Sequence, residues 1–345
     1  MLQEALKNAS LSPSGKRALF ESRGEIFTVP VEHGSTRNLT KDHSSADRAP
    51  IWSPKGDKIA WFSDEGEQGY KLVLQNQDGM GERKTISIGE SKMAWEPQWS
   101  PDGKYIAFVD DDVRYRLVDL ESETIKTIDV GGNNLERGRT GLTWAPDSKW
   151  LAYAKQADNG FKQIKVWSLE EGQSRAITNR MANSVSPAWD QSGKHLFFLA
   201  STDYGLDSGW ANTSSMSADH EYAPYIINLA KDLDSPFALR SDEEKVKKEA
   251  KPDEGKADAD KKADKAESSD KPKDATKKKE GKDKKKDGVV VSIDFDSIER
   301  RIMPLPMPEG RYSGVIHGPK GSVFFAKRAD KGWSFSLHKY SVKKT

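Results

Sequence analysis

The twelve residues "WSPDGKYIAFVD" at 99–110 occur in close variants at several points of the chain. Three variants begin at Trp52, Trp144 and Trp189, so that successive tryptophans are 47, 45 and 45 residues apart. Two weaker copies are "LSPSGKRALFES" at 11–22 and "HGPKGSVFFAKR" at 317–328. A period of about 20–50 residues indicates a fold built from stacked similar units.

Each copy begins with a tight turn and continues into a strand. In Ser-Pro-Asp-Gly the proline presets φ and the glycine accepts the left-handed conformation. Alternating apolar and polar residues follow, as at 104–108, and predict a strand. Further strands are expected at, for example, 25–31 and 37–40. With the strand that ends in tryptophan, each unit has four strands, which is typical of a β-propeller blade.

The repeated tryptophans are expected to pack between neighbouring blades. A catalytic or cofactor-stacking role is the alternative, but every copy carries a large apolar residue at or near this position. One blade cannot bury its own faces, and its neighbours must cover them.

The fold class predicted is all-β, a seven-bladed type of propeller that is incomplete at its C-terminus. One propeller domain is expected to span 1–345. Its sixth blade is predicted to be partial, because it lacks its last strand, and the remaining strands are predicted to lie in a longer parent protein. The expected blades are about 1–41, 42–90, 91–135, 136–180, 181–310 and 311–345.

The period breaks in the fifth blade, where a long insertion separates its strands. Within it, 241–288 has 17 Lys against 15 Asp plus Glu and no aromatic residue. Such a composition buries too little apolar surface to order the chain, so this segment is predicted to be disordered. A strand is expected at Ala223–Ala230, and the stretch from 288 is expected to supply the strand that closes the blade.

Composition excludes several classes of function. The formal net charge is +1, and the lysines of the insertion are neutralised by interleaved acids, so no nucleic-acid partner is expected. The chain has no cysteine, which excludes disulfides and thiolate chemistry. No apolar run approaches the roughly 18 residues of a membrane span, and the first residues lack the apolar core of a signal peptide.

No catalytic residue is predicted. Asp42-His43-Ser44 are adjacent, whereas working triads gather distant residues, so this is interpreted as a polar loop. "GRYSG" at 310–314 has its serine one residue late for a nucleophile elbow. Ser336 and Lys339 would lie on opposite faces of one strand.

No metal or cofactor site is predicted either. The six histidines lack metal-ligand spacing, and no phosphate-binding glycine loop is present. Asp110, Asp111 and Asp112 are interpreted as a solvated hairpin loop rather than a cation site.

One stretch, 203–222, is a candidate binding surface because it gathers aromatic residues in a loop. Its candidate peptide-binding or interaction residues are Tyr204, Trp210, His220 and Tyr222. Such residues bind peptides or pack an insertion onto the body of the protein.

Several stretches resemble tricorn-type serine peptidases. "LSPSGKRALFESRGEIFTVPVEHGSTRNLT" at 11–40 and "APIWSPKGDKIAWFSD" at 49–64 resemble their second propeller. "DLDSPFALRSDEE" at 232–244 and "VSIDFDSIERRIMPLPMPEGRYSG" at 291–314 resemble the same region of bacterial tricorn homologues. The blade motif itself is shared with TolB-like and prolyl-oligopeptidase propellers.

The resemblance implies a two-propeller peptidase that assembles as a hexamer and has PDZ-like and peptidase domains after this region. The propeller would then guide or gate peptides, and no catalytic residue carries over to this chain. Bacterial relatives with this insertion favour the periplasm over the cytoplasm.

Two alternatives remain open. One is a TolB-like propeller that acts as a protein-binding scaffold, and the other is the propeller half of a prolyl-oligopeptidase-type enzyme. A downstream PDZ-like and serine-peptidase region would support the tricorn interpretation, and a G-x-S-x-G elbow downstream would support the last.

Overall fold

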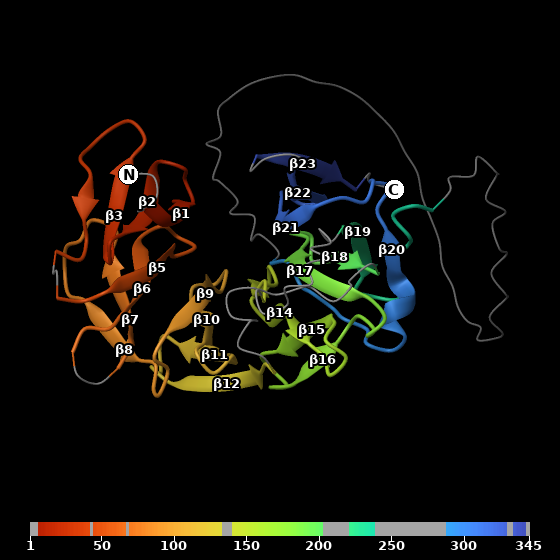
Figure 1. Ribbon diagram of the computed structural model, residues 1–345, viewed down its shortest axis with the longest axis horizontal. Coiled ribbons are helices and arrows are strands. Elements are labelled where there is room, and N and C mark those ends of the chain that lie inside the picture. Colours follow the sequence, from red (N-terminus) through yellow and green to blue (C-terminus); the bar gives the residue numbers. More distant parts are fainter. Residues whose placement is uncertain are drawn as a thin grey trace, which may run out of the picture. The chain divides into compact units, whose positions relative to one another are not determined.

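The computed structural model describes residues 6–41, 44–66, 69–132, 140–202, 221–238, 288–329 and 334–342. The chain divides into two units, Met1–Pro236 with Gly288–Thr345, and Phe237–Asp287. All the described strands belong to the first unit (Figure 1). The predicted disordered segment, 241–288, lies outside the described residues except for Gly288.

The described strands form six antiparallel sheets, in which each strand pairs with the next one along the chain. The first sheet has β1 (Leu6–Leu11), β2 (Arg17–Ser22), β3 (Glu25–Pro30) and β4 (Arg37–Asn38). The second has β5 (Asp47–Trp52), β6 (Lys58–Ser63), β7 (Lys71–Asn76) and β8 (Lys84–Ser87). The third has β9 (Ala94–Trp99), β10 (Tyr105–Asp110), β11 (Arg114–Asp119) and β12 (Ile125–Val130).

The remaining sheets follow the same order. The fourth has β13 (Thr143–Trp144), β14 (Trp150–Gln156), β15 (Lys162–Ser168) and β16 (Ser174–Ala176). The fifth has β17 (Asn183–Trp189), β18 (His195–Ser201), β19 (Ala223–Asn228) and β20 (Ile302–Pro304). The sixth has three described strands, β21 (Tyr312–His317), β22 (Ser322–Arg328) and β23 (Phe335–Ser341).

Consecutive sheets pack on one another through their first strands, which is the arrangement of propeller blades. β5 contacts both β2 and β9, and β17 contacts β14 and β21. In Figure 1 the sheets follow one another in chain order from red to blue. The predicted all-β propeller of four-stranded units is therefore confirmed for five blades, and the sixth shows three strands among the described residues.

The predicted turns form at the start of each unit. Gly56 has a φ of 75° and donates its N–H to the carbonyl of Ser53 at 2.9 Å. Gly103 has a φ of 77° and donates to Ser100 at 2.9 Å. Glycine tolerates this left-handed conformation because it has no Cβ.

The core lies between the sheets. Phe62 of β6 and Phe108 of β10 meet edge to face with ring centroids 5.0 Å apart, and Tyr115 and Tyr153 join the third and fourth sheets at 4.4 Å. The repeated Trp52, Trp144 and Trp189 are buried, and Trp99 is half-buried. These tryptophans therefore pack in the core, as the sequence predicts.

The fifth blade closes with a shorter strand than the sequence suggests. Residues 288–297 form no strand, and a single 3₁₀ turn, η3 (Ile298–Arg301), leads into β20. Val291 and Ile298 are instead buried in the cluster between the fourth and fifth sheets. Apolar residues after 288 therefore fill the space between blades before the chain reaches the sheet edge.

No helix among these residues is long and apolar enough to cross a bilayer.

Candidate functional site

In four blades the residue three positions before the tryptophan has a left-handed backbone conformation. The φ angles are 51° at Ala49, 50° at Glu96, 62° at Gly141 and 53° at Ser186. In β5, β9 and β17 the pairing register shifts at this point. A bulge leaves backbone groups without ladder partners, so other groups must satisfy them.

At two of the four positions a carboxylate from the preceding blade satisfies these groups. Glu96 accepts hydrogen bonds from the N–H of Thr140 at 3.1 Å, from its hydroxyl, and from the N–H of Gly141 at 3.0 Å. Glu21 accepts from the N–H of Ala49 at 3.0 Å. Each acid therefore ties one blade to the bulge of the next.

The tryptophans add a second tie between blades. The indole N–H of Trp144 donates to the carbonyl of Gln98 at 3.2 Å, and that of Trp189 donates to Thr143 at 3.1 Å. The indole nitrogens of Trp52 and Trp99 are buried without a hydrogen-bond partner in the described part of the chain. The tie thus joins the third, fourth and fifth blades.

Clefts open at two of the junctions that lack this tie. The first, which we call the mixed cleft, lies between the second and third sheets, with a volume of about 270 Å³ and Trp99 in its wall. Its charged lining residues are three lysines and three acids, Lys55, Lys58, Lys84, Asp57, Glu82 and Asp102. Charges of both signs therefore balance there.

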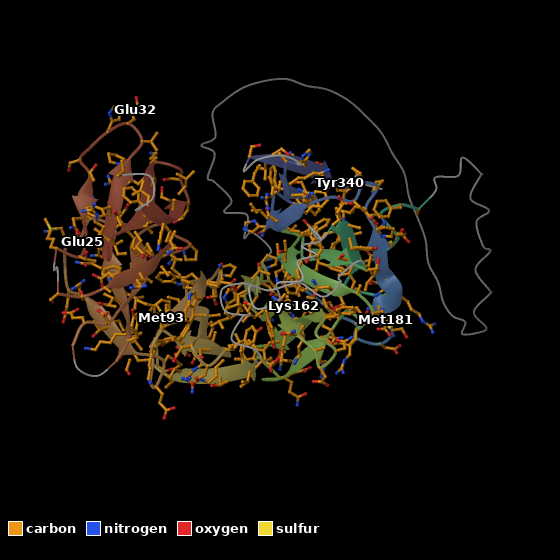
Figure 2. All side chains as sticks on the ribbon, in the orientation of Figure 1. Glu25, Glu32, Met93, Lys162, Met181 and Tyr340 are labelled. Carbon is orange, nitrogen blue, oxygen red and sulfur yellow. The ribbon has the colours of Figure 1, made fainter. Side chains whose placement is uncertain are left out.

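The second, which we call the basic cleft, lies between the turns that open the first two blades and has a volume of about 340 Å³. Its charged or titratable lining residues are Lys16, Arg17, His33 and Lys55, joined by Ser12, Ser14 and Gln77. No carboxylate is among the described residues that line it. Glu32, whose carboxylate is 3.6 Å from His33 Nε2, lies at the exposed outer tip of the loop after β3 (Figure 2).

The acidic run at 110–112 is a solvated hairpin loop only in part: Asp111 and Asp112 form the turn and Asp112 is exposed, but Asp110 is not solvated. Asp110 is fully buried and accepts hydrogen bonds from Ser91 Oγ at 2.8 Å and Arg114 Nε at 2.7 Å. Arg116 Nη1 lies 3.4 Å from the same carboxylate. Arginines fill the place that a cation would take, because they satisfy a buried carboxylate with directed N–H groups.

A further carboxylate joins the third and fourth blades at their outer side. Asp129 of β12 accepts from Lys155 and Lys165, each at 2.6 Å, and from the hydroxyl of Tyr153 at 2.8 Å. Burial acts to raise the pKa of Asp129, but these hydrogen bonds outweigh it and hold the pKa below the usual range. This cluster is an ion-pair clamp between blades.

Three of the four predicted surface residues, Tyr204, Trp210 and His220, lie outside the described residues. Tyr222 is described and forms an isolated bridge with Gly310. Its hydroxyl accepts from Asn183 Nδ2 at 3.1 Å, so at least this residue packs against the fifth blade.

Groups for nucleophilic or metal chemistry are not assembled in the described part of the chain. Ser336 Oγ lies 2.8 Å from His338 Nε2, but both are exposed on β23 and no carboxylate there orients the imidazole. No group of three described His, Asp or Glu residues is placed to hold a metal ion. Asp42 and His43 of the tempting triplet lie outside the described residues.

Sequence reasoning missed Glu96 and the basic cleft. Glu96 precedes a proline, and the same pattern occurs at Ala49 and Ser186. This recurring proline could have indicated a special backbone position in each repeat. The cleft gathers Lys16 and Lys55 from turns one period apart, and only aligning the repeats would have paired them.

Comparison with known proteins gives one family. The family model described as the tricorn protease second beta propeller domain matches residues 6–344. The chain is 26% identical over 235 residues to tricorn protease homolog 1 of Streptomyces coelicolor, covering 67% of this chain and 22% of that protein. It is 26% identical over 230 residues to a tricorn protease homolog of Saccharolobus solfataricus, covering 67% and 20%.

A solved structure shows the same fold. The crystal structure of the tricorn protease superposes with a TM-score of 0.68 at 17% identity, covering 98% of this chain and 29% of that one. The chain thus spans less than a third of the length of each of these three proteins.

Proposed function

The chain belongs to the family of the tricorn protease second beta propeller domain, and on that premise we propose that it is the non-catalytic propeller of a tricorn-like serine peptidase. In this role it guides or gates peptides on their way to a catalytic domain that these residues do not contain. The family match over 6–344 carries the proposal. The described residues support it, because carboxylates and indole N–H groups tie consecutive blades into one scaffold.

The partners proposed follow from the same premise. They are peptides, PDZ-like and peptidase domains of the same polypeptide, and further copies of the chain in a hexamer. The ring is proposed to have seven blades. Phe335 and Leu337 of β23 support this, since they are 59% and 62% exposed and offer an apolar surface for a further strand or blade to cover. Cryo-electron microscopy of the parent protein would count blades and subunits.

The bacterial periplasm is the proposed compartment, and 203–222 with Tyr204, Trp210, His220 and Tyr222 remains a proposed peptide surface. Fractionation of the source cells, with the protein detected by antibody, tests the first. Substitution of Tyr222 by Phe removes only the hydroxyl that Asn183 contacts. If 203–222 binds peptides, this change weakens binding without unfolding the protein.

We propose that the guided peptides pass along the first strands of the blades, and the absence of cysteine allows a direct test of this path. Gln98 is an exposed residue of β9, and Thr127 is an exposed residue of the outermost strand β12 of the same blade. Gln98→Cys and Thr127→Cys variants are each modified with a maleimide, with and without a peptide mixture. We expect peptides to slow modification at position 98 and not at position 127.

Equal rates at both positions, with and without peptide, would contradict the proposal. Incubation of the wild-type chain with fluorogenic peptides is the companion experiment, and no turnover is expected. Robust hydrolysis by the pure chain would show that it is itself an enzyme.

The alternative of a TolB-like scaffold predicts a different outcome. A protein-binding scaffold holds a folded partner and leaves short peptides unbound, so position 98 would then be modified at one rate throughout. The family match favours the peptidase module.

A further inference from the structure

The turns that open the first two blades differ from those of the next two in charge. The third position of the turn is Asp102 in the third blade and Asp147 in the fourth. The corresponding residues are Ser14 and Lys55 in the first two blades, and both line the basic cleft. The third turn position therefore carries no acid where these two turns meet, and the acid of the second turn, Asp57, lines the mixed cleft instead.

Basic groups converge on this cleft from both blades. Lys16 and Arg17 come from the first turn and the start of β2, His33 from the loop after β3, and Lys55 from the second turn. The hydroxyls of Ser12 and Ser14 lie among them. Lysine, arginine and hydroxyl donors without an opposing carboxylate are the usual lining of an oxyanion site.

Arg17 is hydrogen-bonded to neutral groups. Its Nη2 donates to the carbonyl of Thr28 at 3.2 Å, to the Thr28 hydroxyl at 2.9 Å and to the carbonyl of Ser35 at 3.1 Å, all of them neutral acceptors. Its Nε is buried and has no partner within the described ranges. Burial and the neighbouring Arg37 both lower the pKa of Arg17, as expected where positive charge gathers without an anion.

The walls of the cleft are held in place by the turns themselves. Gly15 donates to Ser12 at 2.8 Å, and Gly56 donates to Ser53 at 2.9 Å. A Cβ at Gly56 would lie 3.2 Å from Pro13, so the two turns are in close contact. A preorganised site loses less entropy when it binds than a flexible one does.

We propose that the basic cleft binds the carboxylate of an acidic side chain in a peptide. The Arg17 guanidinium offers the fixed donor, and Lys16 and Lys55 supply charge at the rim. The cleft volume is near the lower end of small-molecule sites, which suits one side chain rather than a folded partner. The choice of a peptide as the ligand rests on the proposed function. The basic cleft would bind that peptide at a position away from the first strands.

Isothermal titration calorimetry with two capped peptides tests the proposal. The peptides are acetyl-Glu-Ala-Glu-amide and acetyl-Gln-Ala-Gln-amide, which differ only in charge and in one atom type per side chain. We expect the acidic peptide to bind and to weaken as salt rises, because salt screens exposed charges. Equal binding of the two peptides would overturn the proposal.

Paired lysine variants locate the binding. Lys16→Met with Lys55→Met removes two exposed charges of the cleft. Lys104→Met with Lys194→Met is the matched control, because both residues are exposed and follow the same turn as Lys16 in later repeats. Two exposed ion pairs are worth about a threefold to thirtyfold change in Kd. We expect this weakening of acidic-peptide binding in the cleft variant and not in the control. Unchanged binding in the cleft variant would overturn the proposal, and so would an equal weakening in the control.

Two further probes identify the source of the anion. Acetyl-Ala-Ala-Ala with a free C-terminal carboxylate should bind more weakly than the acidic peptide. Tighter binding of the free C-terminus would overturn the assignment to side chains. Inorganic phosphate should compete with the acidic peptide, since an oxyanion site accepts both, and failure to compete would place the peptide elsewhere.

The two proposals fail in distinguishable ways. Loss of peptide protection at position 98, with charge-selective binding retained in the basic cleft, would reject guidance along the first strands alone. Protection at position 98 together with binding that ignores Lys16 and Lys55 would reject the basic cleft alone.

Discussion

The indole nitrogen of Trp189 donates to the backbone carbonyl of Thr143 at 3.1 Å, and so ties the fifth blade to the fourth. Thr143 immediately precedes Trp144, whose own indole makes the same bond to Gln98, the residue before Trp99. Trp144 and Trp189 therefore each serve two purposes, since the ring fills the core and the N–H reaches the neighbouring strand.

This tie predicts different costs for the same substitution. Trp189→Phe removes buried volume and leaves the carbonyl of Thr143 without its donor, so we expect a loss of about 2–4 kcal/mol in the free energy of unfolding. Trp99→Phe removes an N–H that has no partner among the described residues, and should cost less than half as much. Urea denaturation measures both, and equal costs would show that the hydrogen bond contributes nothing.

Glu96 is predicted to stabilise the junction between the third and fourth blades. Glu96→Gln leaves one oxygen to accept the bonds from Thr140 and Gly141, and we expect a loss of about 1–3 kcal/mol. Glu90→Gln is the control, because Glu90 is 91% exposed and its ion pair with Arg114 spans 3.7 Å. A change of under about 1 kcal/mol is expected there. Equal losses in thermal unfolding would refute the role of the bulge.

Asp129 predicts a pH dependence of stability. Its pKa is below 3.8 in the folded protein, so the folded state binds its proton more weakly than the unfolded state does. The stabilisation is complete well above pH 3.8, and it decreases as the pH falls through 3.8 towards the folded pKa. Asp129→Asn should lower stability at pH 7 by about 2 kcal/mol and flatten the acid side of the profile. Parallel profiles for both proteins would contradict this prediction.

Gly56 couples the shape of the basic cleft to its turn. Gly56→Ala places a Cβ at a φ of 75° and 3.2 Å from Pro13, so we expect lower stability and weaker binding of the acidic peptide. Gly172→Ala meets a similar φ of 67° with no neighbour within 4 Å. It should lose about 1 kcal/mol for the left-handed backbone and leave peptide binding unchanged. Equal binding by the two variants would mean that contact with Pro13 does not shape the cleft.

The repeat was predictable because it rests on local chemistry. Gly56 and Gly103 must adopt positive φ at their turns, and the apolar alternation of 104–108 leaves one face to bury. These signals are read within a dozen residues and need no knowledge of the neighbouring blade. These signals were therefore enough to predict the strands and the propeller fold.

What failed depends on contacts between distant residues. Asp110 is the last residue of a strand and looks like the start of a polar loop, yet Arg114 and Arg116 turn back to neutralise it in the core. Val291 lies in a run of three valines that suggests a strand, but it fills the space between two blades. Burial of this kind depends on the packing of several elements and leaves no periodic trace in the sequence.

The fifth sheet pairs β19, which ends at Asn228, with β20, which begins at Ile302. Because the entropy of closing a loop rises only with the logarithm of its length, doubling such an excursion costs about 0.6 kcal/mol. This hairpin is thus a natural grafting point: whole modules can be exchanged there over evolutionary time, or by an engineer, while the ring that carries them keeps its register.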